Sequence, residues 1–436
     1  MLAVTSALGL WHFCGTRVQL SPTVRACFRK IDRSFSLTPP PMSNKSLPVD
    51  QEDAWTPLRQ HWTLPDDVAY LNHGAFGLPH REVVAACKKV LDRATSEPMD
   101  FFVREFEPEL LAARDRLADF VGAGRENLVF VENATYGMNV VADSMQLKRG
   151  DEVVLTSHEY GAVFRIWQRA CKASGAHLVQ ASIPLRVDSE DEIVEAITGA
   201  MTDRTRLVVF SHITSATAMK LPAEKITRAV KQQGVEVCID GPHAPAILPL
   251  DIESLDCDYY TAVCHKWISA AHGTGFLYVH PQHQQNIRSV LLSWGRLLPN
   301  VPKTWQEEFT WTGTRDMGAY LALPTALDFL ETLGLDTLRQ RTHFLASYAR
   351  EKIAEVTRED AFIPDDSAWY GSMITMPIRN NGLPYIENAN TLRREYAVDA
   401  PIYDVGDQRV VRTSCYLYNT KDDIDRLADA LRTMLY

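Results

Sequence analysis

The 436-residue sequence lacks several features that mark whole classes of protein. No run approaches the roughly 20 apolar residues that a membrane-spanning helix needs, so we expect no membrane helix. Lysine and arginine form no basic block, and the formal net charge of -10 argues against nucleic acid as the main partner. The eight cysteines include no Cys-x-x-Cys pair and no histidine and cysteine cluster at zinc-ligand spacing, so we expect no structural metal.

What the composition does contain is typical of a large globular protein. Hydrophobic residues make up 46% of the chain and charged residues 23%. A chain of this length can bury a large core, and we expect one large domain and one smaller domain. The scattered cysteines favour a reducing compartment and therefore a cytoplasmic location. The acidic balance leaves acidic small-molecule substrates open, because local cations can bind them.

The first 41 residues differ from the rest of the sequence. Residues 2–13 are mildly apolar, five basic residues follow by position 33, and prolines occupy positions 39–41. No basic segment precedes the apolar run and no small-residue cleavage site follows it, so a secretory signal is disfavoured. We expect residues 1–50 to be a disordered extension. The alternative is that the start of the sequence is mis-assigned and the working protein begins near Met42.

From residue 127 onward, apolar segments of strand length alternate with helical patterns. The predicted strands lie at 128–131, 152–155, 177–183, 207–212, 235–240, 258–263 and 275–279. The predicted helices between them lie at 135–145, 164–171, 189–200 and 222–233. This alternation predicts right-handed βαβ connections and a mostly parallel sheet flanked by helices, which is an α/β fold.

After Thr314 the pattern changes. Helical stretches at 319–333 and 335–356 are followed by strand candidates at 372–377 and 409–413. This change predicts a smaller α+β C-terminal domain. We place the large domain at 51–330 and the small domain at 331–436, and we expect the N-terminal segment of the large domain to pack on the small one.

Two predicted strands lead to an ionisable side chain. Asp240 closes one strand, and Lys266 follows the next. Buried parallel strands deliver such groups to the carboxyl edge of a sheet, where ligands bind. The pair suits pyridoxal 5'-phosphate (PLP), because the amine can bind the cofactor aldehyde and the carboxylate can keep the pyridine nitrogen protonated. A lysine after an apolar run can also be an ordinary strand-end residue.

Residues 133–137, Asn-Ala-Thr-Tyr-Gly, follow a strand and open a helix. Their backbone N–H groups and the Thr135 hydroxyl lie at the positive end of the helix dipole, which suits a phosphate. The same residues could instead serve only as a helix N-cap. They lack the Gly-x-Gly-x-x-Gly pattern of a dinucleotide-binding turn, which disfavours an NAD enzyme.

These motifs occur in the order and spacing of a known family. The strand, Asn-Ala-Thr and helix sequence, then Asp240-x-x-His243, then His265-Lys266, resembles fold-type I PLP enzymes of the class V aminotransferase family. More distantly, the sequence resembles cysteine desulfurases. Segments that are similar to the isopenicillin N epimerase branch lie at 71–77, 311–316, 411–414 and 418–420. The resemblance implies a PLP-dependent enzyme that acts at the Cα of an amino acid or a derived substrate.

The resemblance also implies roles at the cofactor ring. Lys266 matches the lysine that binds PLP, Asp240 the partner of the pyridine nitrogen, and His243 a contact to the phenolic oxygen. Tyr160 lies where the family has the ring that stacks on pyridoxal, and we include it among the catalytic residues. Related desulfurases have His-His-Ala here, whereas this chain has Tyr-Gly-Ala, so the stacking group has changed identity. The alternative is that Tyr160 is a packed core tyrosine.

At the phosphate, the resemblance implies a backbone contact from Ala134 and a hydroxyl contact from Thr135. His265 matches a residue that adds a side-chain contact. Thr314 matches a residue that reaches the phosphate from the other subunit. We therefore expect a homodimer with shared active sites.

Arg412 is the best candidate for binding a substrate α-carboxylate, because a planar guanidinium offers two parallel hydrogen bonds. The alternative is a structural ion pair. Asn72 and His73, in the segment that resembles the epimerase branch, are further candidates for substrate binding.

Three outcomes at Cα stay open: epimerisation, transamination and loss of a β substituent. Epimerisation needs a second proton donor, for which Tyr160 and His158 are candidates. Cysteine desulfurases carry a mobile-loop cysteine shortly before the carboxylate arginine, and residues 395–408 contain none. A cysteine desulfurase or selenocysteine lyase activity is therefore a less favoured alternative, as is a PLP-binding relative without catalysis.

Overall fold

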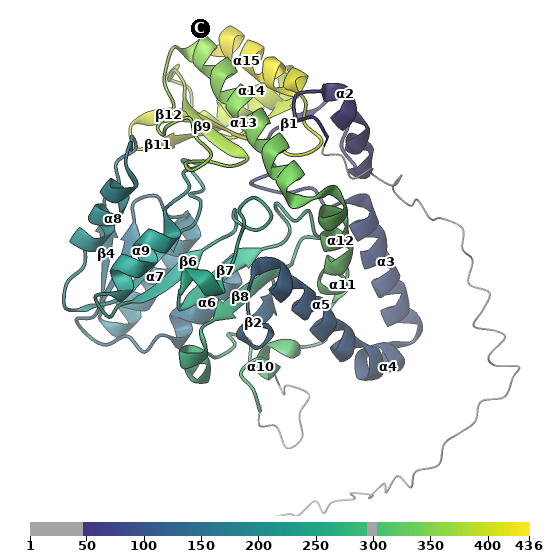
Figure 1. Cartoon of the computed structure of the whole chain (residues 1–436), viewed down its shortest axis with the longest axis vertical. Helices are drawn as coiled ribbons and strands as arrows, with labels where there is room; N and C mark the ends of the chain where they lie inside the picture. Colours follow the sequence, from purple (N-terminus) through teal and green to yellow (C-terminus); the bar gives the residue numbers. More distant parts are fainter. Residues whose placement is uncertain (1–46, 294–302) are drawn as a thin grey trace, which may run out of the picture. The chain divides into compact units, whose positions relative to one another are not determined.

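The computed structural model describes residues 47–293 and 303–436. The predicted N-terminal extension lies outside the described residues, apart from positions 47–50. Within the described ranges, no helix is both long and apolar enough to cross a membrane. Most helices and strands are labelled in Figure 1.

A seven-stranded sheet forms the centre of the fold, in the order β2-β8-β7-β6-β5-β3-β4 (Figure 1). Strands β3 to β7 pair in parallel, whereas β8 is antiparallel to both of its neighbours. The strands are β2 (Leu128–Val131), β3 (Glu152–Thr156), β4 (His177–Ala181), β5 (Thr205–Ser211), β6 (Glu236–Asp240), β7 (Tyr259–Val263) and β8 (Gly275–Val279). The predicted mostly parallel sheet is confirmed.

The helices predicted between the strands are α6 (Ala134–Ser144), α7 (Gly161–Ser174), α8 (Glu190–Gly199) and α9 (Ala223–Lys231). Their boundaries have local causes. The Asn133 side chain accepts from the Tyr136 N–H and caps α6, and Ser189 caps α8 in the same way. Gly175 ends α7 with a φ of 75°, a left-handed conformation that favours glycine.

Other helices surround this unit or follow it along the chain. They are α2 (Glu52–Trp55), α3 (Arg81–Ser96), α4 (Pro98–Asp100), α5 (Phe106–Val121), α10 (Glu307–Thr310), α11 (Gly318–Leu321), α12 (Leu323–Leu333), α13 (Leu335–Thr357), α14 (Tyr385–Glu395) and α15 (Lys421–Leu435). The single helical stretch predicted at 319–333 is divided into α11 and α12. Pro324 lies in the first turn of α12, where its missing N–H costs no helical hydrogen bond.

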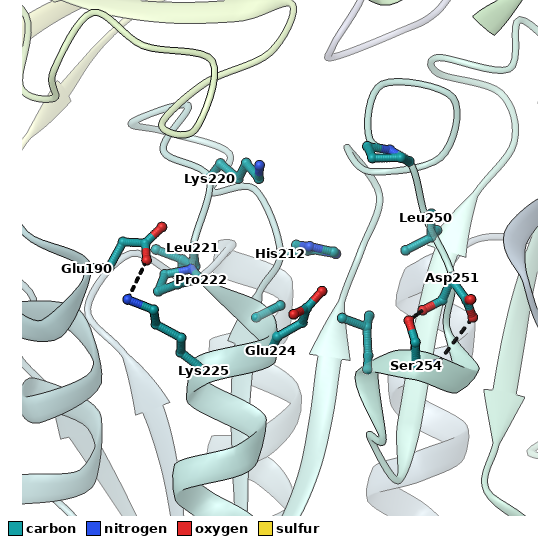
Figure 2. A pocket seen from close by; sticks show the side chains of 13 residues that line it. Glu190, His212, Lys220, Leu221, Pro222, Glu224, Lys225, Leu250, Asp251 and Ser254 are labelled. Carbon is teal, nitrogen blue, oxygen red and sulfur yellow. Dashed lines mark hydrogen bonds and ion pairs between the residues drawn. The ribbon is translucent and has the colours of Figure 1, made fainter. Parts of the chain in front are cut away.

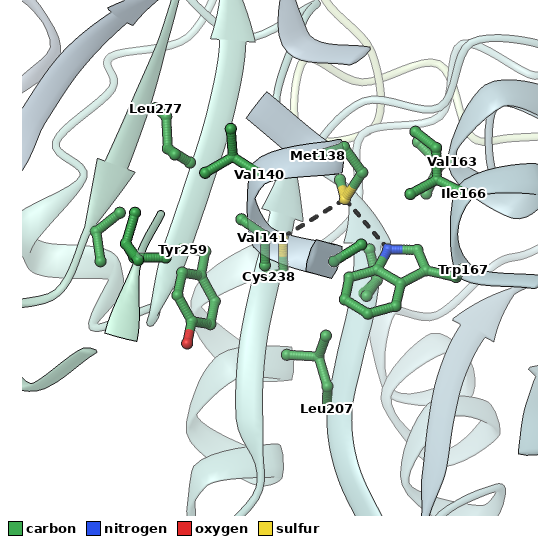
Figure 3. Close-up of a cluster of buried hydrophobic side chains, with 14 of the residues drawn as sticks. Met138, Val140, Val141, Val163, Ile166, Trp167, Leu207, Cys238, Tyr259 and Leu277 are labelled. Carbon is green, nitrogen blue, oxygen red and sulfur yellow. Dashed lines mark hydrogen bonds between the residues drawn. The ribbon is translucent and has the colours of Figure 1, made fainter. Parts of the chain in front are cut away.

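A buried cluster holds α6 and α7 against the central sheet (Figure 3). Met138 of α6 is its centre: the Trp167 indole N–H donates to the Met138 sulfur at 3.2 Å, and the Cys238 sulfur lies 3.9 Å from it. Burial of these large side chains stabilises the contact between helix and sheet. The cluster therefore fixes the N-terminus of α6 relative to the strand ends of the sheet.

The C-terminal part contains a three-stranded antiparallel sheet in the order β11-β12-β9. Its strands are β9 (Met373–Pro377), β11 (Ile402–Val405) and β12 (Gln408–Ser414), and the two predicted strand candidates correspond to β9 and β12. The early strand β1 (Ala69–Tyr70) pairs with β10 (Val398–Asp399). The segment that contains β1 thus pairs with an element of the C-terminal part. The domain boundaries at 51–330 and 331–436 stay a prediction.

Candidate active site

A cavity of about 600 Å³ lies where β5, β6 and β7 end at the carboxyl edge of the central sheet. The N-terminus of α6, the segment after β1, and strands β11 and β12 complete its wall. Predicted site residues that line it are Ala134, Thr135, Tyr160, Asp240, His243, His265, Lys266 and Arg412. Other lining residues include Gly74, Phe76, Ser211, Ser215 and Tyr403.

Lys266 and Asp240 face this cavity from neighbouring strand ends. Asp240 is the last residue of β6 and pairs in register with Thr261 of β7, five residues before Lys266. Burial, and then the Arg412 guanidinium, lowers the pKa of the Lys266 amine to about 7, against the opposing effect of Asp240. Burial also raises the pKa of Asp240 to about 7. The amine can therefore be neutral, and thus nucleophilic, near neutral pH.

Glu159 is a half-buried residue near Asp240 that was not predicted from the sequence. It accepts hydrogen bonds from the Thr156 hydroxyl at 2.5 Å, the Ser211 N–H at 3.0 Å and the Ser211 hydroxyl at 2.7 Å. Ser211 of β5 pairs in register with Asp240 of β6. Burial raises the pKa of Glu159 to about 7. A glutamate in a polar loop segment gives no sequence signal that it will be buried.

The N-terminus of α6 reaches the cavity through Ala134 and Thr135. The close approach of α6 to β7 explains Gly137, because a Cβ at this position would collide with the Thr261 hydroxyl and lie 2.9 Å from the Thr261 Cβ. Burial lowers the pKa of His265, which lines the same cavity, to about 4, so this imidazole is neutral.

The segment after β1 packs directly on the Lys266 backbone. A Cβ on Gly77 would collide with the His265 carbonyl oxygen and lie 2.7 Å from the Lys266 Cα. His73 is buried behind the lysine: its Nε2 lies 2.8 Å from the Lys266 carbonyl oxygen and its Nδ1 lies 2.8 Å from the Tyr418 hydroxyl. The structure thus places His73 as a support of the Lys266 segment and not in the cavity lining.

Arg412 of β12 brings a buried guanidinium to the cavity. Its Nη1 donates to the Ser215 carbonyl oxygen at 2.6 Å, and its Nη2 donates to the Asn72 Oδ1 at 3.4 Å. These contacts fix the side chain while its Nε has no partner. Asn72 therefore orients Arg412 from behind and is not itself among the lining residues.

The remaining predicted residues lie in different surroundings. Tyr160 lines the cavity and is 53% exposed, so it is not a packed core tyrosine. His158 is buried, with its Nδ1 at 2.9 Å from the Thr217 hydroxyl and its Nε2 at 3.1 Å from the Ile183 carbonyl oxygen. Both of its nitrogens are occupied, which removes it as a second proton donor. Thr314 is exposed and lies outside the cavity lining of its own chain.

The donors around the cavity fit PLP. The His265 Nδ1 and the Arg412 Nε are buried and have no hydrogen-bond partner, which is costly unless a ligand supplies one. The first suits a phosphate oxygen and the second suits a carboxylate. Lys266 offers an amine that suits the cofactor aldehyde, and Asp240 offers an acid that suits the pyridine nitrogen. Within 47–293 and 303–436, no three histidine, cysteine or acidic side chains are arranged to hold a metal ion.

A second pocket of about 280 Å³ lies near the start of α9 (Figure 2). Two of its charged groups pair, with the Lys225 amine 2.8 Å from a Glu190 oxygen, and Asp251 accepts from the Ser254 N–H at 3.1 Å. His212 in its wall contacts the Tyr260 hydroxyl at 3.0 Å. This pocket contains no arrangement comparable to Lys266 and Asp240.

Comparisons with known proteins agree with this geometry. The model of the aminotransferase class-V family matches residues 69–427. The chain is 34% identical over 394 residues to the isopenicillin N epimerase of Amycolatopsis lactamdurans, with 87% of this chain and 98% of that protein covered.

Two solved structures share the fold. One is a C-DES mutant with glycine covalently linked to its PLP cofactor, with a TM-score of 0.76 and 19% identity over 86% of this chain and 98% of that chain. The other is the apo cysteine desulfurase of Thermococcus onnurineus NA1, with a TM-score of 0.76 and 20% identity over 90% of this chain and 99% of that chain. The predicted resemblance is confirmed, and the chain belongs to the class-V aminotransferase family of PLP-dependent enzymes.

Proposed function

We propose that the protein acts at the Cα of an amino acid or an amino-acid-derived substrate, with chemistry related to that of isopenicillin N epimerase. The observation that carries this proposal is the arrangement of Lys266, Asp240 and Arg412 around one cavity. When bound, PLP supplies an electron sink that stabilises negative charge at Cα. The residues of the chain supply the binding, the orientation and the proton transfers.

Lys266 has two proposed roles. Its amine would hold the cofactor covalently in the resting enzyme and, with substrate bound, would remove the Cα proton as a general base. The lowered pKa of this amine, about 7, supports both roles because the amine must be neutral. Asp240 would keep the pyridine nitrogen of bound PLP protonated, and His243 would contact its phenolic oxygen.

The proposed phosphate site consists of the Ala134 backbone, the Thr135 hydroxyl and the His265 side chain. The unpartnered His265 Nδ1 supports this assignment. Tyr160 is proposed to stack on the cofactor ring, and its position in the cavity wall supports this role. It is also the remaining candidate for a proton donor on the side opposite Lys266.

Arg412 is proposed to bind the substrate carboxylate, with Asn72 as its orienting partner. A guanidinium that is held on two sides and has a free Nε offers a charge-assisted hydrogen bond in a fixed direction. Fixing the carboxylate would orient the substrate and so select which bond at Cα reacts. His73 is proposed to act on the substrate only indirectly, through the backbone of Lys266.

Persulfide chemistry of the desulfurase kind is less well supported. Residues 395–408 contain no cysteine, and Cys415, which follows Arg412, is fully buried. Burial raises the pKa of this thiol to about 12, which is opposite to what a sulfur-accepting thiolate needs. Epimerase, transaminase and C–S lyase outcomes all begin at Cα and are compatible with the site.

We also propose a homodimer with shared active sites. Phe76 and Tyr160 both line the cavity, yet their side chains are 68% and 53% exposed in a single chain. Large apolar side chains at the rim of a site are commonly covered by a partner. The exposed Thr314 is proposed to reach the phosphate of the partner's site.

The proposal is tested with the PLP-loaded protein and a panel of amino acids in D₂O. We expect deuterium at Cα of the accepted substrates, detected by mass spectrometry, while chirality, keto acid and released thiol distinguish the three outcomes. The Lys266→Ala variant, as control, is expected to lose Cα exchange by at least about 100-fold, because the general base is gone. Equal exchange in this variant, or no exchange for any substrate with the wild type, would contradict the proposal.

A further inference from the structure

Trp267, the residue after Lys266, makes a hydrogen bond that restricts a neighbouring histidine. Its side chain is 1% exposed, and its indole N–H points at the His243 Nδ1 with a distance of 3.3 Å. An indole nitrogen can only donate, so the His243 Nδ1 must accept. In a neutral imidazole the proton is then on Nε2.

The other side of the same imidazole faces the lysine. The His243 Nε2 lies 3.2 Å from the Lys266 Nζ. Because Nε2 carries the proton, this contact is a hydrogen bond only when the lysine nitrogen accepts, which requires a neutral amine. An ammonium group would present a donor to a donor.

Neither aromatic group can easily change its role. Burial holds the pKa of His243 well below its usual range, and the Arg412 charge acts in the same direction, so the imidazole does not take a second proton. The Trp267 carbonyl oxygen accepts from the Tyr416 hydroxyl at 3.0 Å, which fixes the backbone of this residue. The indole donor is therefore held in place against His243.

Several charged or titratable groups act on the Lys266 amine from the elements around it. Asp240 favours the ammonium form, whereas burial and Arg412 favour the neutral form. The neighbouring imidazoles are neutral because their pKa values are lowered. These groups are Asp240 at the end of β6, Arg412 on β12, His243 after β6, His265 after β7 and His73 after β1.

We propose that Trp267 fixes the tautomer of His243, so that this imidazole presents an N–H to the Lys266 nitrogen and keeps the amine neutral. Trp267 is thus a positioning residue for the lysine. The inference rests on the proposed cofactor-binding role of Lys266 and adds a cause for its reactivity. The same tautomer gives His243 a donor for the phenolic oxygen of the cofactor.

The test uses the full chain freed of cofactor and follows the rate of covalent PLP attachment by absorbance across pH. The rate depends on the neutral fraction of the Lys266 amine. In Trp267→Phe, His243 is free to accept a hydrogen bond from an ammonium group. We therefore expect the midpoint of the rate-against-pH curve to rise by about 1 pH unit, and PLP attachment below that pH to slow about tenfold. Trp167→Phe is the matched control, since it also loses a buried indole N–H, donated to Met138, and is expected to keep the wild-type midpoint.

A double-variant cycle identifies the route of the effect. In a His243→Ala background, Trp267→Phe is expected to leave the midpoint unchanged, because the imidazole that transmits the effect is missing. The inference is overturned if Trp267→Phe shifts the midpoint no more than Trp167→Phe, or if its full shift persists without His243. Failure of the proposed function is distinct: the wild type would then show no attachment, or Lys266→Ala would still show it.

Discussion

At the level of single residues, the site depends on burying ionisable groups that are close to one another. Glu159 and Asp240 both have pKa values raised to about 7, in each case mainly by burial. Two neighbouring carboxylates in a low-dielectric region resist ionising together. Hydrogen bonds from Thr156 and Ser211 hold Glu159 in place despite this cost. The protonation of Asp240 is therefore sensitive to Glu159.

Glu159→Gln is expected to change how stability depends on pH. The pKa of Glu159 rises from 4.5 to about 7 on folding, so the folded state binds more protons between these values and stability falls as pH rises through that window. The variant has no carboxyl group at this position and so avoids this loss of stability. We expect its free energy of unfolding to exceed that of the wild type by an amount on the order of 2 kcal/mol at pH 8, and the difference to vanish below about pH 4.5. Urea unfolding of the cofactor-free protein at pH 5 and pH 8 measures it.

Glu152→Gln is the matched control for this prediction. Glu152 is also a buried glutamate, but its pKa is lowered, mainly by the Thr202 hydroxyl, with a further contribution from Arg204. A carboxylate with a lowered pKa stabilises the fold above its unfolded pKa, so this variant should lose stability at pH 8. If both variants changed the free energy of unfolding at pH 8 in the same direction, the assignment of raised and lowered pKa values would be contradicted.

Residue types and strand ends predicted the chemically conspicuous part of the site. Lys266, Asp240 and Arg412 line one cavity, as expected from an amine, an acid and a guanidinium near the ends of predicted strands. Glu159 and Trp267 could not be predicted in the same way. Their contributions depend on which nitrogen or oxygen each side chain meets in three dimensions, and no spacing in the sequence encodes that.

At the level of elements, the position of Lys266 depends on how closely the segment after β1 crosses the end of β7. Gly77→Ala is expected to displace the Lys266 backbone, because the added methyl group meets the His265 carbonyl oxygen and the Lys266 Cα. Overpacking of this kind costs about 1 to 3 kcal/mol. We expect lower thermal stability and loss of PLP on gel filtration, measured by the ratio of cofactor absorbance to protein absorbance.

Gly161→Ala is the control for this substitution. Gly161 is the first residue of α7, and a Cβ there meets nothing within 4 Å. It follows Tyr160 and is therefore close to the cavity, yet the methyl group has space. Unchanged cofactor retention in both variants would show that the close approach at Gly77 does not position the lysine.

Elements of the central sheet were predictable because each has its own local signal. Strands β5 and β6 are continuous apolar runs that end at polar residues, and α6 and α8 begin at capping side chains. Other elements were not predicted from the sequence: α3 and α5 before the sheet, and α14, β10 and β11 in the C-terminal part. The two-residue pairing of β1 with β10 joins positions more than 300 residues apart, so no local pattern reveals it.

At the level of the whole molecule, composition predicted the size class and the alternation of strands and helices predicted the layering, whereas the expected contact with a second chain rested on the family resemblance of Thr314 alone. The cavity of a single chain has an exposed apolar rim at Phe76 and Tyr160, and Thr314 lies outside the lining. These observations support a site that a second chain completes. If so, Lys266 and Thr314 of one chain serve different active sites.

Mixed dimers test this arrangement. Lys266→Ala removes the amine that is proposed to be catalytic, and Thr314→Asp is expected to repel the cofactor phosphate while leaving the fold intact, since Thr314 is exposed. We expect each homodimer to be nearly inactive. Co-expression at equal amounts makes about half of the dimers hybrids, and one of the two sites in each hybrid then has both residues intact, so about a quarter of the wild-type Cα deuteration rate should return. If Thr314 serves its own chain, no hybrid site is intact and the rate stays at that of the parents. Mixing the purified homodimers without subunit exchange provides the baseline.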